Sequence, residues 1–69
     1  MNELHYEVIL TWDAADRIFV AEVPELPGCM AHGRTRAEAL AAAEAAISLW
    51  VKSARRDGAP VPPAGLVIG

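Results

Sequence analysis

This chain contains few residues of the types found in catalytic and metal-binding sites, and their spacing limits the sites that they could form. His5 and His32 are expected on different strands, with no second ligand type at a metal-binding spacing. Asp13 and Asp16 are of the type that binds metal in nucleases, but two-metal cleavage needs several converging acidic groups. Aspartates are also typical of tight turns. We therefore expect no catalytic residue, no metal site and no cofactor.

Cys29 is the only cysteine, so a disulfide within the chain and a zinc site built on several cysteines are excluded. No cation stands beside it in the sequence to lower its pKa. Its neighbour Met30 is apolar, and we interpret Cys29 as a small apolar packing residue. A lone cysteine without a signal peptide favours a reducing, cytoplasmic location.

The size and charge of the chain limit its class. Its 69 residues suffice for one domain, which we expect to span 1–69. Domains this small bury a modest fraction of their surface and often gain stability by oligomerising. The net charge of −3 argues against non-specific nucleic-acid binding, which needs a basic surface. No apolar run approaches the roughly 18 residues of a membrane span.

Alternating apolar and polar residues predict two strands, at residues 4–12 and 17–23. The segment between them contains Asp13 and Asp16 and is typical of a hairpin turn. The face expected to meet a helix carries the following residues: Tyr6, Val8, Leu10, Phe19, Ala21 and Val23.

A rigid turn and a helix start follow in quick succession. Pro24 ends the second strand, and Pro27 with Gly28 predicts a turn before a short third strand at residues 29–32. Gly33 then frees the backbone ahead of Thr35, the expected helix N-cap. Glu38 stands three residues after Thr35, as a capping box requires.

An alanine-rich helix is expected from about residue 35 to about residue 56. The apolar stripe predicted along it comprises Leu40, Ile47, Trp50, Val51 and Ala54. Gly58 is the expected left-handed cap. A proline-containing connector at 59–65 leads to a last short strand at 66–68. The prediction is an α+β fold of order β-β-β-α-β, with one helix on one face of an antiparallel sheet.

This arrangement leaves Ile9, Ile18 and Val20 facing away from the helix. A sheet with apolar residues on its uncovered face usually has a partner there, and edge strands also invite pairing. We therefore expect a homo-oligomer, a dimer or a tetramer, formed through that face or through an edge strand.

The order of motifs resembles the HicB-like antitoxin family over nearly the whole chain. The resemblance is carried by the run Val23-Pro24-Glu25-Leu26-Pro27-Gly28-Cys29 and by Gly33-x-Thr35-x-x-Glu38-Ala39-Leu40. The motif residues that carry over are structural, and they are Pro24, Pro27, Gly28, Gly33, Thr35 and Glu38.

The resemblance implies a reduced ribonuclease-H-like fold without the nuclease's catalytic carboxylates. It also implies an antitoxin that binds a HicA-like toxin, an mRNA-cleaving ribonuclease, and occludes its active site. Many family members carry a C-terminal DNA-binding domain. This sequence stops soon after the last expected strand, which leaves direct DNA binding in question.

The motif residues do not indicate which surface binds the partner, so we predict that surface from charge. A basic, RNA-binding partner would be attracted by acidic groups. We therefore expect the partner surface among Glu7, Asp13, Asp16, Glu22, Glu25 and His32. Two alternatives stay open: a stand-alone oligomeric scaffold with no toxin, and a minimal metal-dependent nuclease, for which the sequence gives no positive support.

Overall fold

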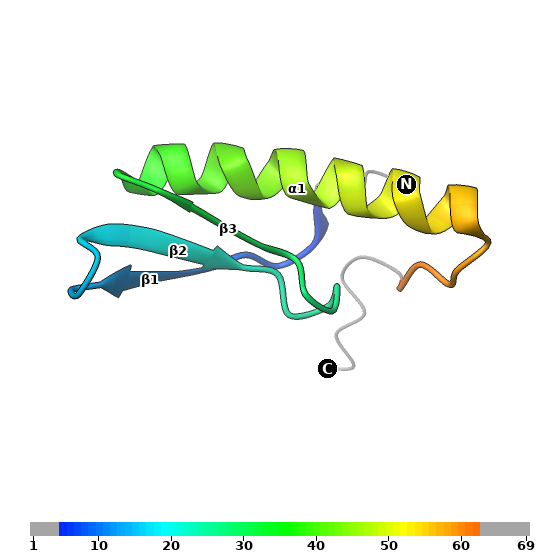
Figure 1. Ribbon diagram of the computed structural model, residues 1–69, viewed down its shortest axis with the longest axis horizontal. Coiled ribbons are helices and arrows are strands. Elements are labelled where there is room, and N and C mark those ends of the chain that lie inside the picture. The colour runs from blue at the N-terminus through cyan, green and yellow to red at the C-terminus, as the bar shows by residue number, and fades with distance from the viewer. Residues whose placement is uncertain (1–4, 63–69) are drawn as a thin grey trace.

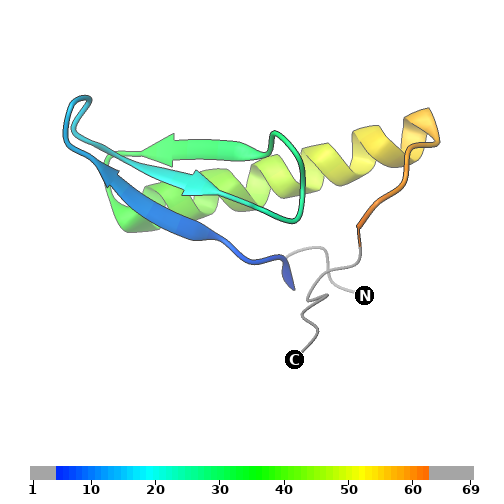
Figure 2. The ribbon, with the colours of Figure 1, turned by 90° about the horizontal axis from the view of Figure 1, so that it is seen from below.

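The computed structural model describes residues 5–62, and within them an antiparallel sheet is covered on one face by a helix. The elements are β1 (Ile9–Asp13), β2 (Ile18–Glu22), β3 (Met30–Gly33) and α1 (Arg36–Asp57). The strand order is β1-β2-β3, so β2 is central (Figure 1, Figure 2). The predicted α+β class and the order β-β-β-α are confirmed. The strand expected at 66–68 lies outside the described residues.

The first two strands are shorter than the alternation predicted, because pairing stops near Pro24. Ile9 pairs with Glu22, and Pro24 follows two residues later without a backbone donor to continue the ladder. β1 therefore begins at Ile9 rather than at residue 4. β3 begins at Met30 and extends through Gly33, which pairs with Phe19.

The hairpin between β1 and β2 is held by one carboxylate. Asp13 Oδ1 accepts hydrogen bonds from the amides of Ala15 at 3.0 Å and Asp16 at 3.2 Å. Arg17 completes the reversal with a φ of 56°, in the left-handed region. The interpretation of Asp13 as a turn residue is confirmed.

Both ends of α1 are capped as the sequence predicts. Thr35 Oγ1 accepts from the amide of Glu38 at 3.0 Å, and Glu38 Oε1 accepts from the amide of Arg34 at 3.0 Å. The reciprocal bond of the capping box thus goes to the residue before the cap. At the other end Gly58 has a φ of 72°, the conformation of a left-handed C-cap.

The buried side of α1 differs from the predicted stripe at its first half. The buried residues are Ala39, Ala43, Ile47, Val51 and Ala54. Leu40 is 40% exposed, so its predicted place in the stripe is wrong. The reason is close approach: Ala39 and Ala43 pack against Ala21 of β2, and this short distance leaves no room for a leucine.

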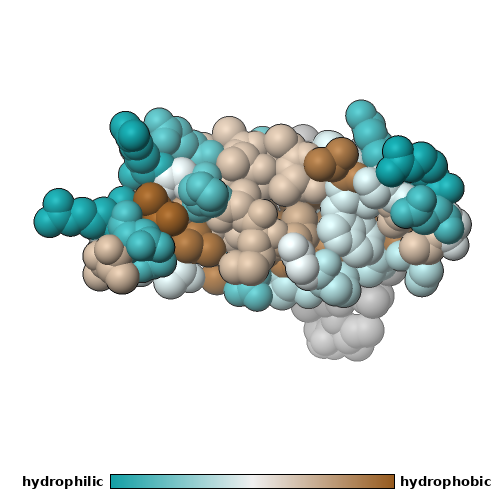
Figure 3. Space-filling view, in the orientation of Figure 1, coloured by the Kyte–Doolittle hydropathy of each residue, from teal (hydrophilic) through white to brown (hydrophobic). Residues whose placement is uncertain are grey.

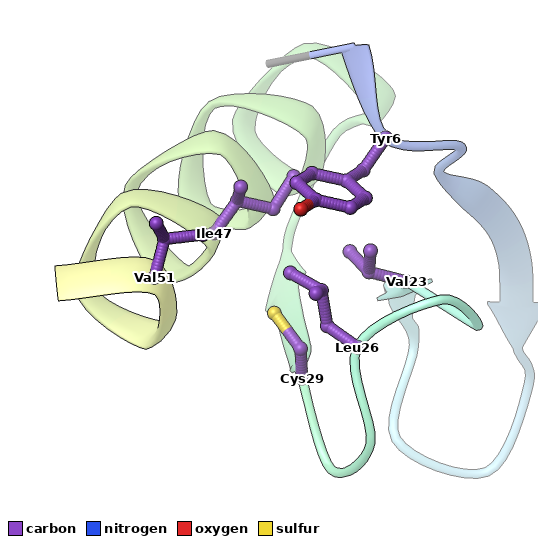
Figure 4. Packing of buried hydrophobic residues seen from close by; sticks show 6 residues of the cluster. All are labelled: Tyr6, Val23, Leu26, Cys29, Ile47 and Val51. Carbon is purple, nitrogen blue, oxygen red and sulfur yellow. The ribbon is translucent and has the colours of Figure 1, made fainter. Parts of the chain in front are cut away.

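Larger side chains fill the core beside the second half of α1 (Figure 4). Tyr6, Val23, Leu26, Cys29, Ile47 and Val51 form one cluster of buried side chains. The loop after β2 is tied to the helix by Trp50, whose Nε1 donates to Pro27 O at 3.0 Å. The hydroxyl of Tyr6 donates to the carbonyl of Pro62, so the two ends of the described chain meet.

Candidate protein-binding surface

One face of the sheet is left uncovered by α1, and we call it the open face. Side chains alternate along a strand, and Leu10, Phe19, Ala21 and Ala31 are on the helix side. The open face therefore carries the intervening residues: Ile9, Thr11, Asp13, Ile18, Val20, Glu22, Met30 and His32.

Apolar side chains run across the open face. Ile9 and Met30 are 44% and 57% exposed, and they flank Glu22 on the neighbouring strands. Val20 is half-buried between Thr11 and His32. The prediction that Ile9, Ile18 and Val20 face away from the helix is confirmed. Met30 belongs to the same strip and was missed, although its spacing of two from His32 could have revealed it.

The six residues proposed for the partner surface fall into separate places. Asp13, Glu22 and His32 are on the open face, and Asp16 is in the hairpin turn. Glu7 and Glu25 lie beside each other beyond the sheet, where Glu25 Oε1 accepts from the amide of Glu7 at 2.7 Å.

The two ends of the sheet differ in charge. Glu7, Glu22 and Glu25 gather at one end, because Glu7 precedes the Ile9 partner of Glu22 by two residues and Glu25 binds Glu7. We call these three residues the glutamate end.

The hairpin end of the sheet is mixed in charge. Asp13 and Asp16 share it with Arg17, and the Arg36 guanidinium lies 4.7 Å from the centre of the Phe19 ring. Acidic charge is therefore offset at the hairpin end. A basic partner would be favoured at the glutamate end.

The motif residues shape the backbone around β3. Cys29 N donates to Leu26 O at 3.0 Å, and Val23 N donates to Cys29 O at 3.0 Å, closing the loop that contains Pro24 and Pro27. Gly28 has a φ of 76°, which L side chains rarely adopt. Gly33 admits α1, because a Cβ there would lie 2.4 Å from Ala39 N.

Side chains of the types that bind metals do not cluster in residues 5–62. No three His, Cys, Asp or Glu side chains among them gather closely enough to hold a metal ion. Cys29 is buried, and desolvation raises its thiol pKa from 9.0, so the nucleophilic thiolate is disfavoured at neutral pH. What these residues offer is a surface of mixed apolar and acidic character.

Such a surface, on a small sheet backed by one helix, is of the kind that binds another protein. The family model described as the HicB-like antitoxin of bacterial toxin–antitoxin systems matches residues 6–67. The chain belongs to this family, and the resemblance drawn from its motifs is confirmed. An antitoxin role, with a toxin as partner in general terms, follows from that membership.

Two relatives match most of the chain. UPF0150 protein Ta0767 of Thermoplasma acidophilum is 37% identical over 59 residues, which are 86% of this chain and 84% of that protein. The crystal structure of TTHA0281 from Thermus thermophilus superposes with a TM-score of 0.79 at 29% identity. The superposition covers 94% of this chain and 80% of that chain.

Within the described residues, no helix has the length and apolar character to cross a membrane.

Proposed function

We propose that the protein neutralises a HicA-like, mRNA-cleaving ribonuclease by binding over its active site. The observation that carries the proposal is the family match over residues 6–67. The protein is not an enzyme in this proposal and works in the cytoplasm, where its toxin would meet mRNA. It requires no cofactor, since occlusion needs only a complementary surface.

The glutamate end is the part of the surface best suited to such a toxin. A ribonuclease that binds mRNA needs cationic groups against phosphates. Glu7 and Glu22 are exposed carboxylates, and the exposed Ile9 lies directly beside Glu22. Carboxylates that reach the toxin's cations would occupy the place of RNA phosphate, while Ile9 and Met30 supply apolar contact. Charge of this kind mainly speeds encounter and sets partner choice.

The test is co-expression with a HicA-like toxin, followed by pull-down and an RNA-cleavage assay. A stable complex with suppressed cleavage supports the proposal. The double variant Glu7→Lys/Glu22→Lys should weaken binding more than about tenfold and reduce its salt dependence.

The matched control for this variant is Glu44→Lys/Asp57→Lys, which changes the net charge equally on α1. If both double variants bind like the wild type, the glutamate end is not the toxin surface. Equal weakening by both would show a general effect of net charge instead.

A second candidate function is a stand-alone oligomeric scaffold without a toxin. The apolar strip on the open face favours it, because exposed Ile9 and Met30 suit a protein contact of either kind. A folded, oligomeric protein that captures no toxin and leaves cleavage unchanged would select this candidate over the antitoxin.

A further inference from the structure

The outer edge of β3 and the side of α1 next to it form a second surface, which excludes the glutamate end and shares Met30 with the open face. β3 is an edge strand of the described sheet, and its residues Met30–Gly33 include no Lys, Glu, Asp or Pro. Natural sheets usually protect an edge with such residues. Because β3 has none of them, its outer edge can pair with another strand.

The free backbone groups of this edge can be assigned from the ladder. Val23 N donates to Cys29 O at 3.0 Å, so these two residues stand at a hydrogen-bonded position of the ladder, although Cys29 N donates to Leu26 O instead. Bonded and non-bonded pairs alternate along an antiparallel ladder. Ala31 and Gly33 therefore bond to β2, whereas Met30 and His32 direct their amide and carbonyl groups outward.

Beside this edge, α1 carries a second stripe, which we call the edge stripe: Ala42, Ala46, Leu49 and Ser53. Its spacings of four, three and four place these residues on one side of the helix. A groove of about 420 Å³ links the stripe to β3, with Met30, Ala46, Leu49, Trp50 and Ser53 among its lining residues. Leu49 is 68% exposed at this surface.

Charge is absent from the middle of this surface. Among the charged residues of the helix, Glu44, Lys52 and Arg55 lie on its other sides. Glu38 and Arg56 are in line with the edge stripe, beyond its two ends. Figure 3 shows hydrophilic residues gathered at the two ends of the molecule, with an apolar band between them over α1 and β3. Two copies that carry the same net charge of −3 repel each other least where neither presents a charge.

We propose that this surface joins two copies of the chain through antiparallel pairing of β3 with β3 of the second copy. The register that uses the outward groups of both residues places Met30 of each copy opposite His32 of the other. That register makes two bonded pairs, each exchanging both of its N–H···O bonds, with Ala31 on the twofold axis. The result is one continuous sheet across both copies.

The helices fit the same arrangement. Adjacent strands lie about 4.8 Å apart, so helices that cover two paired edge strands come close together. Helix axes about 8 Å apart require small residues at the contact. The edge stripe supplies them as Ala42 and Ala46, and Figure 2 shows α1 crossing behind β3 without covering its outer edge.

The first test is the mass of the purified chain in solution without any toxin. Light scattering should give twice the 7.4 kDa of the chain at micromolar concentration. Ala42→Arg should weaken dimerisation more than about tenfold, because it places bulk and like charge at the helix contact. Ala41→Arg, one residue away on an exposed side of α1, should leave the dimer intact. A monomeric wild type, or a dimer indifferent to Ala42→Arg, overturns the proposal.

A covalent test reads the register. In a non-bonded antiparallel pair the Cα atoms are about 4.5 Å apart, within the range of about 4.4–6.8 Å for disulfides. Oxidised Ala31→Cys should therefore yield a covalent dimer, while Thr11→Cys on the open face should not. Cross-linking of Thr11→Cys alone would place the contact on the open face and refute the β3 pairing. Because no toxin is present, failure here leaves the antitoxin proposal untouched.

Discussion

Gly33→Ala should destabilise the protein strongly, although it adds only one methyl group. A Cβ at this position would lie 2.4 Å from Ala39 N and 2.7 Å from Glu38 C. Both contacts are to the backbone of the first turn of α1, so no side chain can rotate away. The start of the helix must move off the sheet, and the packing of Ala39 and Ala43 against Ala21 opens with it.

The expected cost is about 3 kcal/mol, the upper part of the range for overpacking a well-packed site. A domain of this size has a total unfolding free energy of only about 3–5 kcal/mol. With a urea dependence of about 1 kcal/mol/M for a small protein, the unfolding midpoint should fall by about 3 M. Urea titration followed by circular dichroism, at one protein concentration for all variants, measures this shift.

Gly28→Ala is the matched comparison, because it isolates a different cause. Gly28 has a φ of 76° and open space where a Cβ would lie. Its substitution should cost about 1 kcal/mol from backbone strain alone. At Gly33 an alanine would be stabilising if room existed, since it restricts the unfolded chain. A midpoint for Gly33→Ala equal to or above that of the wild type would refute the close-approach argument.

Two further perturbations test the helix cap and the core. Thr35→Ala removes the acceptor of the Glu38 amide and should cost about 1 kcal/mol in urea unfolding, whereas exposed Thr11→Ala should stay within about 0.5 kcal/mol. Burial raises the Cys29 pKa above 9.0, so the folded state holds its proton more tightly and stability should fall as pH rises past that value. Thermal unfolding between pH 8 and about pH 10 checks this against Cys29→Ala, which should lack that part of the decline.

Most of the fold could be predicted from local sequence patterns. Thr35, Glu38 and Gly58 act through bonds to residues a few positions away, so their roles as caps could be read from spacing. Alternation likewise placed Ile9, Ile18 and Val20 on the open face. The alternating pattern alone did not predict the strand ends. Pairing of β1 stops where its partner strand β2 approaches Pro24.

Leu40 was predicted to be buried in the core and is instead 40% exposed. Its hydrophobicity favours burial, yet the separation of α1 from the sheet is set by Ala21, Gly33 and Ala39, which belong to three different elements. The candidate surface was limited in the same way. Six residues were grouped by charge and type, and the structure separates them into the open face, the hairpin turn and the end of the sheet at Glu7 and Glu25.

The bond between Tyr6 and Pro62 has a consequence for the order of folding. β1 pairs with β2, β2 pairs with β3, and α1 returns along β3, so each step closes only a short loop. Tyr6 and Pro62 are 56 positions apart, and joining them carries the largest loop-closure entropy among these steps. The hairpins and helix can therefore form first, with topology favouring speed. The contact between Tyr6 and Pro62 therefore forms last during folding. In local unfolding it is the first contact to be lost.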